Sequence, residues 1–251
     1  MTVLRETLLD EAHFDKTIRF KEQTIEKEKN ALKSDPGQFV KPEGIYELIF
    51  SFEHHGWIAR YSRGASIDEL KDRFPSIVQA AEELRRVDTR GVYSFDFNPL
   101  LDNYVTALWL LSQAYLLKAE AALLARLLAC IGNEGKDLLF ERLVAKVAPG
   151  VSRTPAKKLL YPKAYQPLYD ALDAPAEQQA ALMQQFLKKW YKRMSSTGWH
   201  DAHKGPGGGG FFGYWCWEAA GVAYAFGIED ASFRDLPHYP KDLAEYARRQ
   251  S

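Results

Sequence analysis

Apolar residues recur at helical spacing along most of the chain. Within residues 2–32, charged positions are interspersed with apolar ones at Leu4, Leu8, Leu9, Phe14, Ile18 and Ile25, and this pattern predicts an amphipathic helix. Pro42 suits the first position of a second helix that runs to about residue 63. Ser66–Glu69, with the sequence SIDE, is a capping box that opens a third helix. No stretch of the chain predicts a strand.

The most apolar stretch follows a loop at residues 86–98. Asn98 and Pro99 suit the cap and first turn of one long helix that ends at Gly132. Because this helix is apolar on nearly all sides, we expect it in the middle of a bundle. Further helices are expected to begin at Thr154–Pro155 and at Pro175, to span Gly213–Gly227, and to begin again at Pro240. The predicted fold is all-α, a single helical body of about nine helices in two packed parts, residues 1–90 and 91–251.

Charge and cysteine content narrow the class of protein. The chain has 33 basic and 33 acidic residues, and this neutral balance argues against a general nucleic-acid-binding protein. Cys130 and Cys216 lie in apolar surroundings without CxxC spacing, which predicts reduced core thiols. The N-terminus is charged from Arg5 onward and does not resemble a signal peptide. We therefore expect a cytoplasmic protein.

A glycine run precedes the aromatic C-terminal region. A phosphate-binding loop needs spaced glycines followed by Lys-Ser or Lys-Thr at a helix start. Here Gly207–Gly210 are followed by Phe211 and Phe212. The run therefore predicts a flexible connection rather than a nucleotide site.

Glu218 is the one acid inside the aromatic helix predicted for Gly213–Gly227. Large apolar residues surround it on the helix, so we expect its carboxylate to be at least partly buried and to need a cation, several donors or a proton. His200, Lys204 and Arg234 are nearby in the sequence, and a structural ion pair with one of them is the favoured interpretation.

A metal-dependent helical enzyme is the alternative. It would use Glu218 together with His200, Asp201 and His203 of the sequence WHDAHK. Zinc sites need three or four convergent ligands, and neither cysteine has a suitable spacing from these histidines. We therefore favour loop-anchoring or core histidines and expect no metal or other cofactor.

The C-terminal segment is rich in acids and tyrosines. Such a surface is either an ordinary solvated face or a docking patch for a basic protein, in which acids speed the encounter and aromatic residues anchor the contact. The candidate contact residues are Glu229, Asp230, Asp235, Tyr239, Asp242 and Glu245.

Four stretches of this sequence resemble PoNi-type immunity proteins. They are IARYSRGASIDELK, DNYVTALWLLSQAYLL, WHDAHK and FFGYWCWEAAGVAYAFGIEDASFRDLPHYPKDL. The last of these fits an aromatic-Gly-Tyr-Trp-x-x-Glu pattern. We interpret the signature residues as builders of the shared fold: Asp201, His203, Gly213, Tyr214, Trp215 and Glu218.

This resemblance implies a function as well as a fold. PoNi-type proteins are two-part, all-helical partners of PoNe-type DNase toxins from type VI and other polymorphic toxin systems. The resemblance therefore implies a cytoplasmic protein without enzymatic activity that binds a cognate DNase toxin and occludes its DNA-binding or active site. A nucleic acid or a membrane is not expected as a partner.

Overall fold

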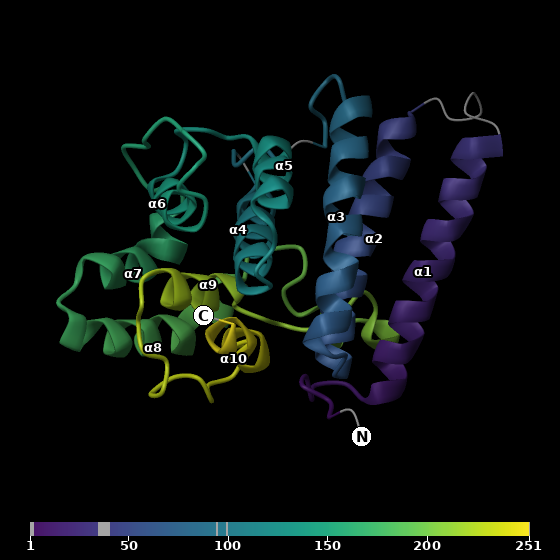
Figure 1. Ribbon diagram of the computed structural model, residues 1–251. Coiled ribbons are helices and arrows are strands. Elements are labelled where there is room, and N and C mark those ends of the chain that lie inside the picture. The colour runs from purple at the N-terminus through teal and green to yellow at the C-terminus, as the bar shows by residue number, and fades with distance from the viewer. Residues whose placement is uncertain (1–2, 35–40, 94, 99, 251) are drawn as a thin grey trace. The chain divides into compact units, whose positions relative to one another are not determined.

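The computed structural model describes residues 3–34, 41–93, 95–98 and 100–250. These residues form ten α-helices and contain no strand (Figure 1). The predicted all-α class is confirmed, with ten helices in place of about nine. Pro99, expected in the first turn of a helix, lies outside the described residues.

The chain divides into two compact units. One consists of the described residues of Met1–Ser94 together with Asp201–Gly213, and the other of those of Phe95–His200 together with Tyr214–Ser251. The first unit thus takes in a short stretch from late in the sequence. The division into domains at 1–90 and 91–251 stays a prediction.

Three helices make up most of the first unit: α1 (Glu11–Ser34), α2 (Pro42–Arg63) and α3 (Ile67–Val87). Helix α2 packs against both α1 and α3 (Figure 1). The interior holds Phe14 of α1, Trp57 of α2 and Phe74 of α3, each at most 1% exposed. The indole N–H of Trp57 donates to the carbonyl of Leu70 over 2.7 Å, which satisfies the one polar atom of this buried side chain.

The turn between α2 and α3 follows the local sequence signals. Gly64 ends α2 in the left-handed conformation, with φ of 104°, and its N–H reaches the carbonyls of Arg60 and Tyr61. Ser66 then caps α3, because its hydroxyl accepts from the N–H of Glu69 over 3.1 Å. Pro42 at the first turn of α2 is confirmed as well.

Replacing Gly64 by alanine is expected to destabilise the first unit. The backbone there has positive φ, and an added Cβ would lie 2.4 Å from the carbonyl oxygen of Val3. We expect the free energy of unfolding to fall by about 1–2 kcal/mol or more, as measured by chemical denaturation. Gly150→Ala is the control, because an added Cβ there meets no atom within 4 Å.

The glycine run departs from the predicted flexible connection at Gly208, which is packed, whereas Gly207, Gly209 and Gly210 are exposed. An added Cβ on Gly208 would lie 2.4 Å from Leu9 Cδ1. The two phenylalanines that follow are buried, and the hydroxyl of Ser62 donates to the carbonyl of Phe212 over 2.7 Å. The Phe212 ring also stacks on His55 of α2, with centroids 4.1 Å apart. Apolar burial of these two rings holds the loop against α1 and α2.

Seven helices belong to the second unit (Figure 1). They are α4 (Leu101–Leu116), α5 (Ala121–Ile131), α6 (Leu138–Val147), α7 (Pro162–Asp173), α8 (Ala176–Arg193), α9 (Trp217–Ala225) and α10 (Lys241–Arg249). Helix α4 is the predicted central helix, and its Leu108, Leu110 and Leu111 are fully buried. It packs against α5, α6, α9 and α10. Among the described residues, no helix is both long enough and apolar enough to span a bilayer.

Three predicted helix boundaries are wrong, and one of them is the start of the helix expected from Gly213, which begins only at Trp217. The single helix expected to end at Gly132 is two helices, because the chain turns at Lys118 with φ of 55° before α5 begins. The helix expected from Thr154 begins only at Pro162. The carboxylate of Glu134 accepts both the N–H and the hydroxyl of Thr154, and the carboxylate of Asp137 accepts the N–H of Leu160 over 2.8 Å. These bonds hold residues 154–160 in a non-helical path.

Candidate functional site

The acidic C-terminal segment contains both interior and exposed residues. Asp230 is 1% exposed and Tyr239 is 3% exposed. The hydroxyl of Tyr239 donates to Asp230 over 2.9 Å, and Asp230 also forms ion pairs with Arg234 and Arg248. Burial and the neighbouring carboxylate both raise the pKa of the Tyr239 phenol, so it stays a neutral donor. These two residues therefore tie the segment to α10 from the inside.

The other candidate contact residues lie at the surface. Glu229, Asp235 and Asp242 are exposed, and Glu245 is half-buried. Asp235 pairs with Lys241 over 2.5 Å, and Glu245 pairs with Arg249 over 3.2 Å. Such exposed pairs contribute little to stability, so they are compatible with exchange for other partners. The role of the whole set in partner binding stays a prediction.

Glu218 is completely buried, but the predicted ion pair is wrong. Its Oε1 accepts from the indole N–H of Trp190 over 2.7 Å and from the hydroxyl of Tyr165 over 3.0 Å. Burial raises the pKa of the Glu218 carboxyl, and the backbone, Trp190, Tyr165 and the Cys216 thiol lower it only in part. Neutral donors on α7 and α8 thus take the place of a cation.

Aromatic rings of the second unit pack around this acid's partners. The ring of Trp190 stacks on Trp199 with centroids 5.6 Å apart, and Tyr214 lies against Trp199. Tyr214 and Trp215 are buried, and Gly213 before them has φ of 112°. Cys130 and Cys216 are buried free thiols, as predicted.

The four residues of the alternative metal site have separate surroundings. His200 stacks on Tyr191 with centroids 4.3 Å apart, Asp201 pairs with Lys204 over 2.9 Å, and the His203 ring lies 5.8 Å from that of Phe211. In the described part of the chain, histidine, cysteine and acidic side chains nowhere gather in threes as metal ligands would. The enclosed Glu218 bonds instead to Tyr165 and Trp190.

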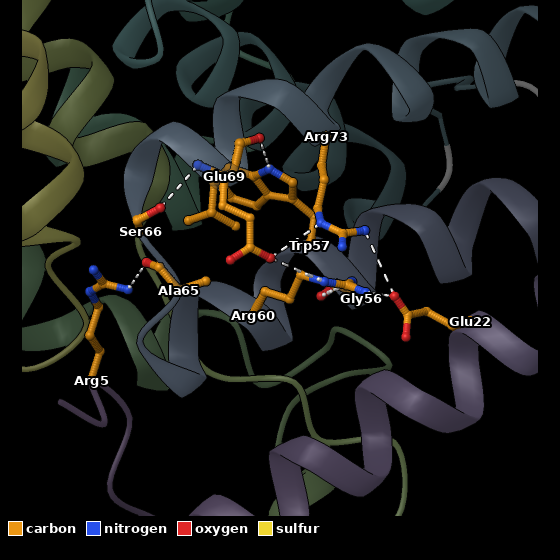
Figure 2. A network of polar contacts seen from close by, with 10 residues as sticks. Arg5, Glu22, Gly56, Trp57, Arg60, Ala65, Ser66, Glu69 and Arg73 are labelled. Carbon is orange, nitrogen blue, oxygen red and sulfur yellow. Dashed lines mark hydrogen bonds and ion pairs between the residues drawn. The ribbon is translucent and has the colours of Figure 1, made fainter. Parts of the chain in front are cut away.

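Sequence reasoning missed a polar network in the first unit (Figure 2). The guanidinium of Arg60, from α2, pairs with Glu22 of α1 and lies 3.9 Å from Glu69 of α3. Arg73 pairs with Glu69 over 3.3 Å and lies 3.7 Å from Glu22. The sequence pattern did not indicate this network, because pairing between helices leaves no signal at a fixed spacing.

This network lines an open groove of about 680 Å³ between the three helices. Arg60 is nearly buried, and its Nη1 also donates to the carbonyl of Gly56 over 3.2 Å. Arg5, which precedes α1, donates to the carbonyl of Tyr61 and to that of Ala65, the latter drawn in Figure 2. The first unit therefore presents a groove whose charged groups are held by several helices at once.

These observations define a helical protein in which the aromatic signature residues of the second unit are interior scaffold. Residues 5–129 match the family described as PoNe immunity protein (PoNi), N-terminal, and residues 135–243 match PoNe immunity proteins (PoNi), C-terminal. The chain belongs to the PoNe immunity proteins, and the resemblance inferred from the sequence is confirmed. Its function is immunity against PoNe nuclease toxins.

A solved structure has the same fold. The crystal structure of protein PA2201 from Pseudomonas aeruginosa matches this chain with a TM-score of 0.77 and 18% sequence identity. The match covers 99% of this chain and 92% of that one. At this identity the likeness shows the fold alone. None of the curated proteins matches the chain.

Proposed function

We propose that this protein neutralises a PoNe-type DNase in the cytoplasm by binding it directly, without enzymatic activity. The observation that carries the proposal is the family match over both parts of the chain. The proposed partner is a toxin of a type VI or related secretion system that the producing cell must itself survive. Direct binding requires only complementary surfaces, whereas an enzymatic antidote would require a reactive site that modifies the toxin.

Occlusion is the proposed mode of inhibition. A DNase binds a phosphodiester backbone, so its DNA-binding surface carries a positive field. We propose that the exposed acids Glu229, Asp235 and Asp242, with Glu245 beside them, dock against that surface and exclude DNA. Asp230 and Tyr239 support this segment from within through their mutual hydrogen bond.

Titration of DNA cleavage tests direct binding. Increasing amounts of the purified chain are added to a fixed amount of the toxin, and residual cleavage is measured. We expect cleavage to disappear at an equimolar ratio, because a tight inhibitor is consumed by complex formation. Complete inhibition at a small fraction of that ratio would indicate turnover and would contradict the proposal.

Charge reversal tests the docking surface. We expect Glu229→Lys/Asp235→Lys to slow association with the toxin by about tenfold at low salt, because acids in the interface steer a basic partner. Stopped-flow fluorescence measures the rate, and the difference should shrink as salt screens the charges.

The matched control is Asp72→Lys/Asp170→Lys, which makes the same change of net charge at exposed positions of α3 and α7. If both double variants slow association equally, overall charge rather than the C-terminal segment governs docking. That result would remove these acids from the proposed interface while leaving the stoichiometric inhibition intact.

A further inference from the structure

The groove between α1, α2 and α3 contains several cations that already have partners. Arg60 is compensated by Glu22 and Glu69, and Arg73 by the same two acids. Lys29 of α1 pairs with Glu53 of α2 over 2.9 Å. Compensated pairs of this kind gain little from a further anion.

Lys21 of α1 lines the same groove, but its surroundings differ from those of the paired cations. It is 5% exposed, and its Nζ lies 4.1 Å from the centroid of the Phe52 ring. Its stem runs past Gly56, where an added Cβ would be 3.8 Å from Lys21 Cδ. Within the described residues no acid forms an ion pair with it. Burial is the cause that lowers the pKa of Lys21 to about 8.

A buried ammonium group without an anion is costly, and an incoming anion relieves that cost. The aromatic face of Phe52 compensates the charge only in part, since a cation–π contact is weaker than a charge-assisted hydrogen bond. Gly56 of α2 lies beside the lysine stem. Among the described residues, the charge of Lys21 is therefore compensated only in part.

We propose that Lys21 forms the base of a carboxylate-binding site, and that this site takes an acidic side chain of the toxin. The proposal rests on the proposed function, since it places a second contact of the same complex on the first unit. A single carboxylate fits better than a polyanion. Three glutamates, Glu22, Glu26 and Glu53, line the groove and would repel a phosphodiester chain.

Binding at this site has a defined pH dependence. A bound carboxylate raises the pKa of Lys21 above its free value of about 8. Binding therefore has its full strength below about pH 8 and weakens as the pH rises, by at most about tenfold per pH unit.

The charged groups that line the groove with Lys21 include the carboxylates of Glu22 on α1 and Glu53 on α2 and the guanidiniums of Arg60 on α2 and Arg73 on α3. Burial holds the pKa of His55 on α2 well below its usual value, so that ring is neutral throughout.

Lys21→Met tests the site, because methionine keeps an unbranched stem and removes the charge. Calorimetric titration with catalytically inactive toxin should show an affinity about tenfold lower or weaker still, without the decline above about pH 8. The same variant should melt at a higher temperature than the unaltered chain, since an uncompensated buried charge is gone. A lysine with a purely structural role would give a lower melting temperature.

Lys33→Met is the matched control, an exposed lysine of the same groove. It should leave affinity and melting temperature unchanged within error. If Lys21→Met binds the toxin as tightly as the unaltered chain does, the site is overturned while the proposed function stands. If the unaltered chain does not bind the toxin, the proposed function fails instead.

A second measurement does not depend on the toxin. The Lys21 side-chain signal is followed by NMR while the full chain is titrated with sodium acetate, and separately with inorganic phosphate at equal ionic strength. Acetate should raise the pKa of Lys21 in the unaltered chain. A response to phosphate alone, or none to acetate, would overturn the carboxylate assignment.

Discussion

Replacing Gly221 by alanine is expected to cause the largest loss of stability of any single methyl addition in the second unit. Helix α9 packs against α4 at this residue, and an added Cβ would lie 2.5 Å from Ser112 Oγ, 2.6 Å from its Cβ and 3.1 Å from its Cα. Two of these atoms belong to the rigid part of a buried helix. Over-packing of this kind costs about 3 kcal/mol, of which the better helix propensity of alanine offsets ~1 kcal/mol.

Tryptophan fluorescence during chemical denaturation measures the loss of stability of the second unit. Five of the six tryptophans belong to the second unit, and only Trp57 belongs to the first. Adding Ser112→Gly to the Gly221→Ala variant removes two of the three clashing atoms. The double variant should therefore be more stable than expected from the sum of the two single effects. Strict additivity would show that the two helices do not meet as described.

The short-range features of the fold could be predicted from the sequence. The cap at Ser66, the left-handed end at Gly64 and the proline at the start of α2 depend on a few adjacent residues, and all three are present. Burial of α9 was predictable too, because its apolar residues surround the helix on every side.

Features that depend on distant residues were not predictable. The break between α4 and α5 occurs inside an uninterrupted apolar pattern, so periodicity predicts one helix. The path of residues 154–160 is fixed by the carboxylates of Glu134 and Asp137, which precede it by about twenty residues. The donors to Glu218 lie on α7 and α8, whereas the predicted partners were chosen for nearness in sequence.

The candidate site was likewise only partly predictable from the sequence. Acid content predicted the C-terminal surface, but which acids face inward depends on Arg234 and Arg248, which compensate Asp230. Likewise, Lys21 looks like any other lysine on an amphipathic helix. Its burial beside Gly56 and Phe52 of α2 depends on a neighbouring helix and has no signal in the spacing of its own helix.

Glu218→Gln is expected to make the second unit more stable than the unaltered chain at neutral and alkaline pH, and not at acidic pH. Burial raises the pKa of the Glu218 carboxyl in the folded protein above its unfolded value. Below the unfolded pKa both states hold the proton, so the full contribution of this residue is present. As the pH rises toward the folded pKa, the unfolded chain loses the proton first and stability falls. Glutamine does not ionise, and its carbonyl oxygen accepts the same two hydrogen bonds from Trp190 and Tyr165.

Glu218→Ala separates the role of the hydrogen bonds from that of the charge. It leaves Trp190 and Tyr165 without their acceptor and opens a cavity, so we expect a loss of about 2–4 kcal/mol at acidic pH. The loss should narrow as the pH rises, because the unaltered chain itself becomes less stable there. Glu229→Gln, an exposed acid of the same unit, should change stability by less than about 0.5 kcal/mol. Denaturation at about pH 5 and about pH 8 distinguishes the outcomes. If glutamine is as harmful as alanine at the higher pH, Glu218 acts as a charged carboxylate, and the upward shift of its pKa by burial is wrong.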